Sequence, residues 1–328
     1  MRPFPLTAHR ARACLGALLA LPALGLAACS VNDATVTSAP STASGMASAA
    51  ASAQSVPLQP LDTSLNAKLP ATYRSGRPLV LGVNEYSPYN TFGSDGKITG
   101  LVPDLAAQLS SMLGVKITIE KATFDAIVPA LKSGRLDLSA PAGDFVERQQ
   151  QVDFADFAKS NVTVMVNTSA SFTPRASLDL CGRKVGVEKG AGTQNVVAAV
   201  SHRCGQADKA AVDEQVFADL SSAALALQSK RIDAVAAPSA ANTSASASSG
   251  GRFSTVKIDD MQSLPAATAT YGIEVKKGSG LAEVVADALR TLYDDGTYAR
   301  LFEKWSLDLS ALERSKITVN GSTQYQSK

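Results

Sequence analysis

Apolar runs and helical periods alternate along most of this 328-residue chain. Short runs rich in valine, leucine and isoleucine, at 79–83, 115–120 and 136–140, have the length and composition of strands. Segments with apolar residues every three or four positions, at 101–113 and 124–133, predict helices with one buried face. Such alternation favours an α/β fold with mostly parallel sheets.

The pattern repeats after a turn-rich break at 168–174. We expect strands at 184–187, 232–237 and 270–275 and helices at 195–202, 219–230 and 281–293. The low-complexity run Ala240–Gly251 predicts a surface loop. About 260 residues carry these elements, which is more than one hydrophobic core usually spans, so two lobes are expected.

Residues 1–28 have the features of a lipoprotein signal peptide. A basic head is followed by an apolar stretch at 15–26 that is too short to span a bilayer. The sequence Leu-Ala-Ala-Cys at 26–29 is a lipobox, in which the thiol of Cys29 receives the lipid. The alternative is an ordinary secretory signal in which Cys29 is incidental. We expect a lipoprotein anchored at the outer side of the bacterial cell membrane.

The segment 29–67 consists mainly of alanine, serine, threonine, valine and proline, with almost no charge. It has no apolar period, so it cannot bury enough surface to offset the entropy lost on ordering. We expect a disordered tether between the lipid and the folded lobes.

Cys181 and Cys204 are the cysteines left once the signal has been removed and Cys29 has been lipidated. An even pair outside the membrane favours a disulfide. A zinc site or a reactive thiol lacks supporting ligands, since the histidines are His9, in the signal, and His202. We expect a disulfide and no metal.

The net charge is +2 and no block of basic residues occurs, which argues against a nucleic-acid partner. No second apolar run approaches 18 residues, so the lipid is the expected membrane contact. Nothing in the sequence calls for a cofactor, and we expect a monomer.

An ordered set of short motifs spans residues 79–157. The motifs are LVLGV at 79–83, NEYSPY at 84–89, GLVPD at 100–104, SGRLDL at 133–138 and VDFA at 152–155. In order and spacing the set resembles the polar amino-acid-binding family of extracytoplasmic solute-binding proteins, family 3, which feed importers of the ABC type.

The resemblance implies a periplasmic-binding-protein-like clamshell of two lobes, with the ligand cleft between them. The chain would cross twice, so that lobe 1 takes 68–168 and 271–328 and lobe 2 takes 169–270. The function implied is capture of a small polar carboxylate, most simply an amino acid or a derivative, for an ABC permease, with no catalysis. The alternative is a dehydratase-like enzyme on the same fold, for which Glu85 and Asp144 are the available acid or base groups.

Four positions of the first half match ligand-binding positions of the family. Arg148 would grip the ligand carboxylate, which a guanidinium can do bidentately; otherwise it is a surface arginine. Tyr86 and Phe124 would sandwich the ligand, although Phe124 could instead belong to the core. The backbone N–H of Gly143 would meet the carboxylate.

Gly192 and Thr193 match a further binding loop. They precede a predicted helix, whose N-terminus presents backbone donors. The Thr193 hydroxyl would bind the ligand, cap the helix, or do both.

Pro238 is the main departure from the family pattern. It stands where members usually carry a carboxylate that pairs with the ligand's α-ammonium. Glu85 or Asp144 could replace that group, or the ligand could lack an α-amine. Pro238 predicts that the amine contributes less to binding than the carboxylate.

Overall fold

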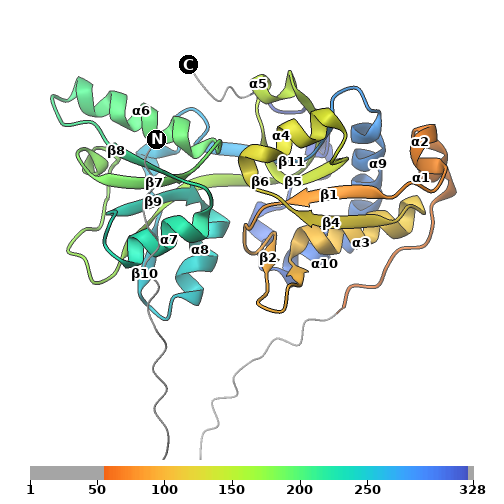
Figure 1. The fold of residues 1–328 in the computed structure, drawn as a ribbon, viewed down its shortest axis with the longest axis horizontal. Coiled ribbons are helices and arrows are strands. Elements are labelled where there is room, and N and C mark those ends of the chain that lie inside the picture. Colours follow the sequence, from red (N-terminus) through yellow and green to blue (C-terminus); the bar gives the residue numbers. More distant parts are fainter. Residues whose placement is uncertain (1–54, 324–328) are drawn as a thin grey trace, which may run out of the picture. The chain divides into compact units, whose positions relative to one another are not determined.

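The computed structural model describes residues 55–323, whose arrangement is shown in Figure 1. The strands are β1 (Leu79–Val83), β2 (Thr91–Phe92), β3 (Ile98–Thr99), β4 (Ile117–Lys121), β5 (Leu138–Asp144), β6 (Val152–Asn167), β7 (Lys184–Glu188), β8 (Asp213–Phe217), β9 (Ala234–Pro238), β10 (Phe253–Val256) and β11 (Thr268–Lys276). The α-helices are α1 (Thr63–Lys68), α2 (Ala71–Arg74), α3 (Leu101–Leu113), α4 (Phe124–Ser133), α5 (Val146–Gln149), α6 (Thr193–Gln206), α7 (Leu220–Gln228), α8 (Ser239–Ser248), α9 (Leu281–Asp294) and α10 (Thr297–Lys304). Short 3₁₀ helices are η1 (Ser177–Leu180), η2 (Asp259–Met261), η3 (Asp308–Ser310) and η4 (Arg314–Lys316).

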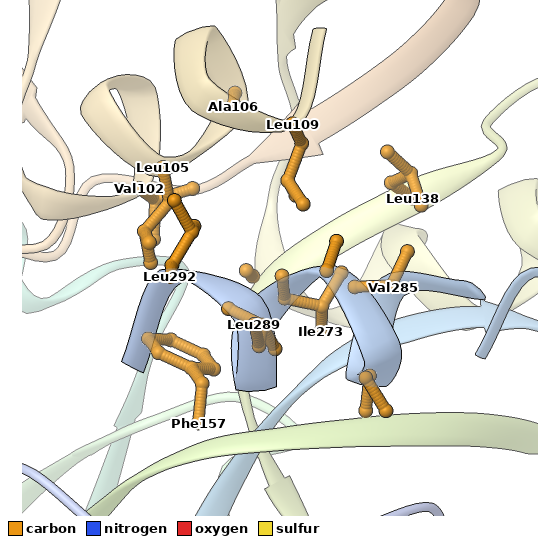
Figure 2. Close-up of a cluster of buried hydrophobic side chains, with 14 of the residues drawn as sticks. Val102, Leu105, Ala106, Leu109, Leu138, Phe157, Ile273, Val285, Leu289 and Leu292 are labelled. Carbon is orange, nitrogen blue, oxygen red and sulfur yellow. The ribbon is translucent and has the colours of Figure 1, made fainter. Parts of the chain in front are cut away.

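Lobe 1 is built on the strand order β4-β1-β5-β11-β6. β1 pairs in parallel with β4 and β5, whereas β11 is antiparallel to β5 and to the first part of β6. Helices α3, α9 and α10 cover one face, and α4 covers the other. Figure 2 shows the larger cluster, where Leu105 and Leu109 of α3 gather with Leu289 of α9, Phe157 of β6 and Ile273 of β11.

Lobe 2 contains the last part of β6, which pairs antiparallel with β9 and β10, followed by the parallel strands β9, β7 and β8. Successive side chains of β6 point to opposite faces of this sheet, as the pleat requires. Val164 and Val166 pack in the cluster of α6, and Met165 packs in the cluster of α7.

β6 belongs to both lobes. Its residues up to Asn161 pair with β11, and those from Val162 onward pair with β9. At this change of partner the Val162 N–H donates to the carbonyl oxygen of Ala267 at 2.7 Å, just before β11 begins. The chain therefore leaves lobe 1 and returns to it through two adjacent segments that run in opposite directions.

The two-lobed α/β class is confirmed. Parallel pairs occupy the outer part of each lobe, whereas β6 and β11 pair antiparallel because the chain passes between the lobes in both directions there. The boundaries expected after residues 168 and 270 remain predictions. The change of strand partners supports placing them at 161–162 and 267–268.

The expected tether, 29–67, ends earlier than its composition predicted. Helix α1 begins after Asp62, whose carboxylate accepts from the backbone N–H groups of Ser64 and Leu65. Leu65 and Leu69 are buried in the core of lobe 1. Two leucines four residues apart suffice to bury one face of a short helix, so the folded part starts before residue 68. Residues 1–54, which hold the predicted signal peptide and Cys29, lie outside the described residues.

The run Ala240–Gly251 is helical over most of its length, which corrects the expectation of a surface loop. Asn242 of α8 is buried, and its Nδ2 donates to the Thr163 carbonyl oxygen of β6 at 3.1 Å. Alanine has the highest helix propensity, and contact with the sheet supplies the buried face that a low-complexity composition did not reveal.

Cys181 and Cys204 form a disulfide, which confirms the predicted pair. The bond joins the residue after η1 to helix α6 within lobe 2. Each helix among residues 55–323 is either too short or too polar to cross a lipid bilayer.

Candidate ligand-binding site

A cavity lies where the two lobes meet, beside Val162 and Ala267. Cavities that hold small ligands combine apolar walls with a few polar groups. Each position that the sequence singled out lines this cavity: Tyr86, Phe124, Gly143, Arg148, Gly192 and Thr193. Their contact with a ligand stays a prediction.

The topology explains why residues so far apart in sequence come together. Tyr86 follows the carboxyl end of β1, Gly143 lies near the carboxyl end of β5, and Glu188 is the last residue of β7. The carboxyl ends of neighbouring parallel strands meet at one edge of a sheet, where the loops that bind ligands are found. The two sheets present these edges to the same cavity.

Arg148 projects from the short helix α5 and is only 8% exposed. Its Nη1 donates to the carbonyl oxygen of Gly143 at 3.0 Å, and its Nη2 donates to that of Gly190 at 3.3 Å. The guanidinium carbon lies 5.3 Å from the ring centre of Phe124 and 5.8 Å from that of Phe145. A guanidinium carries five N–H donors, more than these two carbonyls require.

Gly143 and Phe145 support this arginine. A Cβ atom at Gly143 would lie 2.5 Å from the Phe145 ring, which is closer than real contacts allow. The absence of a side chain therefore lets the ring pack against the backbone of β5. Phe145 is buried, so it forms a fixed wall beside Arg148.

Two tyrosines form a polar bridge in the cavity wall. The hydroxyl groups of Tyr86 and Tyr271 are 2.9 Å apart, and both side chains are buried. Burial raises the pKa of Tyr86 well above its usual value and that of Tyr271 to about 12. Both hydroxyls are therefore neutral at physiological pH and can donate as well as accept hydrogen bonds.

Gly192 and Thr193 lie in the turn between β7 and α6. Gly192 is the N-cap residue of α6, and Thr193 is its first helical residue, so Thr193 does not hold the capping position. Its side chain is buried in the cavity wall. Gly190 has φ of +78°, a conformation that favours glycine.

Glu188 is a charged cavity residue that the sequence reasoning missed. It is 6% exposed, and its Oε1 accepts from Nδ2 of Asn84 at 3.3 Å. Burial, aided by the charges of Asp219 and Asp125, raises the pKa of Glu188 to about 8, although the hydrogen bond from Asn84 lowers it. The sequence feature that could have identified it is a charged residue at the end of an apolar strand, directly before a glycine-rich loop.

The carboxylates that were considered as substitutes at Pro238 lie elsewhere. Asp144 is fully buried, and its two oxygens accept from Gln149 Nε2 at 2.8 Å and from the Ser322 N–H at 2.9 Å. Burial raises the pKa of Asp144. Glu85 lines a neighbouring hollow rather than the cavity. Pro238 itself does line the cavity.

Glu274 of β11 is a second buried carboxylate near Arg148. It is 1% exposed, and among the described residues neither of its carboxylate oxygens has a hydrogen-bond partner. Burial, with a smaller contribution from the charge of Asp144, raises the pKa of Glu274 to about 7, although the charge of Arg148 lowers it. Glu274 and Arg148 both line a second hollow, and Glu274 does not line the cavity itself.

Comparisons with known proteins point in one direction. The sequence pattern of the bacterial extracellular solute-binding proteins, family 3, matches residues 79–308. The arginine-binding protein ArgT of Corynebacterium glutamicum is 28% identical over 256 residues, which cover 77% of this chain and 82% of that protein. A probable histidine-binding protein of Campylobacter jejuni is 33% identical over 155 residues, which cover 46% of this chain and only 56% of that relative's length.

A solved structure shares the fold over nearly its whole length. It is that of an ancestral arginine-binding protein bound to arginine, with a TM-score of 0.62 and 31% sequence identity. The match covers 70% of this chain and 99% of that chain. The likeness therefore extends over both lobes and the connection between them.

Proposed function

This chain belongs to the bacterial extracellular solute-binding proteins, family 3, and we propose that it captures an amino acid or an amino-acid derivative for an ABC importer. The relatives described above are named for binding arginine and histidine. The lining of the cavity supports a small polar ligand, because apolar walls surround a few charged and polar groups.

The burial of Arg148 in the cavity wall is the main support for a ligand with a carboxylate. A permanently charged guanidinium, almost fully buried in the cavity wall, requires an anionic or strongly accepting partner. Two backbone carbonyls and two aromatic rings hold it in one orientation. A carboxylate that accepts two parallel N–H groups fits such a fixed planar donor, so the ligand carries a carboxylate.

The binding cycle is opening and closing of the two lobes. Arg148 of lobe 1 donates to Gly190 of lobe 2, and Asn84 of lobe 1 donates to Glu188 of lobe 2. Rotation about the crossing at 161–162 and 267–268 would separate these pairs and open the cavity. Ligand would be captured on closure and released to the permease on opening.

The cellular setting follows from the N-terminus, which lies outside the described residues. We infer that Cys29 carries lipid and holds a monomeric binding protein at the outer side of the membrane. Residues up to about 54 would then link the lipid to the folded lobes.

The enzyme alternative is not supported by the two groups named for it. Neither Glu85 nor Asp144, the acid or base groups considered from the sequence, lines the cavity. Asp144 is moreover engaged by two donors that hold it away from any ligand. Binding without catalysis remains the function that the geometry supports best.

A thermal-shift screen of the twenty amino acids, with the methyl ester of the best ligand as control, tests this function. A ligand that binds the native state alone raises the melting temperature by mass action. We expect at least one amino acid to do so and its ester to fail. Absence of any shift would contradict amino-acid binding, and an equal shift with the ester would contradict the carboxylate contact.

A further inference from the structure

Glu188 brings a carboxylate into the cavity that Arg148 also lines. It is 6% exposed, and its hydrogen bond from Nδ2 of Asn84 measures 3.3 Å, which is long for a bond to a charged acceptor. Burial of an ionised carboxylate with one weak neutral donor is unfavourable. The position therefore suits either a protonated acid or a carboxylate that meets a cation.

Asn84 points to the same chemistry. It is 4% exposed and lines the cavity, yet its Oδ1 has no hydrogen-bond donor among the described residues. This corner thus offers two acceptors, the Glu188 carboxylate and the Asn84 carbonyl, without donors to match. An ammonium or guanidinium group carries several N–H donors and a positive charge, so it would satisfy both.

The charges around Glu188 are mainly negative. The charges of Asp219 before α7 and Asp125 of α4 both raise the pKa of Glu188. The charge of Glu188 in turn raises the pKa of Tyr271 of β11. Lys189, the residue after Glu188, forms an ion pair with Asp125 at 2.7 Å. The remaining charged groups of the surroundings are Arg148 on α5, which is held by Gly143 and Gly190, and Lys121 and Glu85, which line the adjoining hollow.

We propose that Glu188 and Asn84 hold a protonated nitrogen of the ligand while Arg148 holds its carboxylate. This inference rests on the proposed function and specifies it, because it selects ligands with a nitrogen cation over plain carboxylates. Glu188 would thus replace the carboxylate that family members usually carry at the position of Pro238. The nitrogen is either the α-ammonium or a cation of the side chain, and the two sources share one chemistry.

Proton release distinguishes a cation from a neutral partner. With a pKa of about 8, Glu188 is mostly protonated at pH 7, and a cation beside it would favour the ionised form. Binding of a cation at pH 7 would therefore release about one proton and tighten as the pH rises toward 8. A neutral hydrogen-bond acceptor would leave Glu188 protonated and release none.

The first experiment uses the unaltered protein. Calorimetry with the tightest-binding amino acid of the screen, in phosphate and in Tris buffer at pH 7, should give different heats because the buffers take up the released proton differently. Equal heats in the two buffers would overturn the inference. Since this test needs no variant, a failure of any variant to fold cannot leave the question open.

The second experiment measures the Kd of Glu188→Gln and of the wild type for L-arginine and for L-citrulline, whose side chain is neutral. It also measures the Kd for the tightest-binding amino acid of the screen and for the 2-hydroxy analogue of that amino acid. Loss of a bond to a charged group predicts a roughly ten- to hundredfold weaker Kd for the tightest ligand. Loss for L-arginine with no loss for L-citrulline would identify a side-chain cation. Loss for both amino acids, with none for the hydroxy analogue, would identify the α-ammonium.

The failure of this inference differs from the failure of the proposed function. If Glu188→Gln binds all ligands within twofold of wild type while Arg148→Ala abolishes binding, the carboxylate site stands and the cation site is overturned. If no amino acid binds the wild type, the proposed function itself fails. Glu283→Gln, an exposed position on α9, serves as the matched control and should bind as wild type.

Discussion

The Nη2 atom of Arg148 donates to the carbonyl oxygen of Gly190 at 3.3 Å, which links lobe 1 to lobe 2 inside the cavity. The same guanidinium is tied to lobe 1 through Gly143. The group that we place at the ligand carboxylate therefore also senses the separation of the lobes. Ligand capture and closure share one side chain, and each would favour the other.

Substitution of Arg148 tests the placement of the carboxylate. Arg148→Ala would leave a desolvated ligand anion unpaired, which costs roughly 3–5 kcal/mol, or two decades or more in Kd. Arg148→Lys should recover only part of this, because lysine offers a point charge without the bidentate geometry. Calorimetry with the tightest amino acid measures both.

Arg135→Ala is the matched control for this series, since Arg135 is exposed on the same lobe and does not line the cavity. It should bind as wild type. Wild-type affinity in Arg148→Ala would show that the carboxylate binds elsewhere.

Cys29 should be the mature N-terminus and the point of lipid attachment. Cys29→Ala removes the thiol that accepts the lipid, so we expect soluble or uncleaved protein in place of the membrane-bound form. Cell fractionation and mass spectrometry of the N-terminus measure the change. Wild-type protein free in the medium, with a different N-terminus, would contradict the anchor.

The Cys181–Cys204 bond should contribute to the stability of lobe 2. The partners are 23 positions apart, and closing a loop of this length restricts the unfolded chain by roughly 3 kcal/mol. We expect the double variant Cys181→Ser, Cys204→Ser to lose about this much unfolding free energy in urea titrations. Added reductant should destabilise the wild type and leave the variant unchanged; equal stabilities under oxidising conditions would refute the contribution.

Glu274 should make stability depend on pH. Its pKa is about 7 in the folded protein against an ordinary value of 4.5, so the native state keeps the proton to higher pH than the unfolded chain. The stabilisation is complete below about pH 4.5 and is lost as the pH rises to about 7. Glu274→Gln cannot ionise, so its stability relative to wild type should rise between pH 5 and pH 8, by at most roughly 3 kcal/mol.

Urea unfolding at the two pH values measures this difference. Glu283→Gln, whose side chain is exposed, is the control and should show no such change. A Glu274→Gln stability difference that is equal at pH 5 and pH 8 would show that the carboxylate does not hold its proton in the native state.

The periodicity of the sequence predicted helices such as α3 and α9 because burial of one face leaves a 3.6-residue pattern in the chain. It failed where the buried face is small or built of alanine. In α1 two leucines make the contact, and α8 is held by Asn242 and small residues. Such segments become ordered through their neighbours rather than through their own pattern.

Sequence patterns likewise identified some residues of the candidate site and missed others. Arg148 and Thr193 could be found because ordered motifs surround them, and both line the cavity. Glu188 could not, since a glutamate at the end of a strand is ordinarily solvated. Its hydrogen-bond donor, Asn84, is 104 positions away and belongs to the other lobe.

By itself, the sequence determined the α/β class, the two lobes and the disulfide pair, because these follow from local periodicity, ordered motifs and the number of cysteines. The tertiary structure alone decided which carboxylates face the cavity. Asp144 accepts hydrogen bonds from Gln149 and from the Ser322 N–H outside the cavity, whereas Glu188 accepts from Asn84 in the cavity wall. The protonation and partners of a carboxylate depend on desolvation by residues distant in sequence, which only the packed lobes supply.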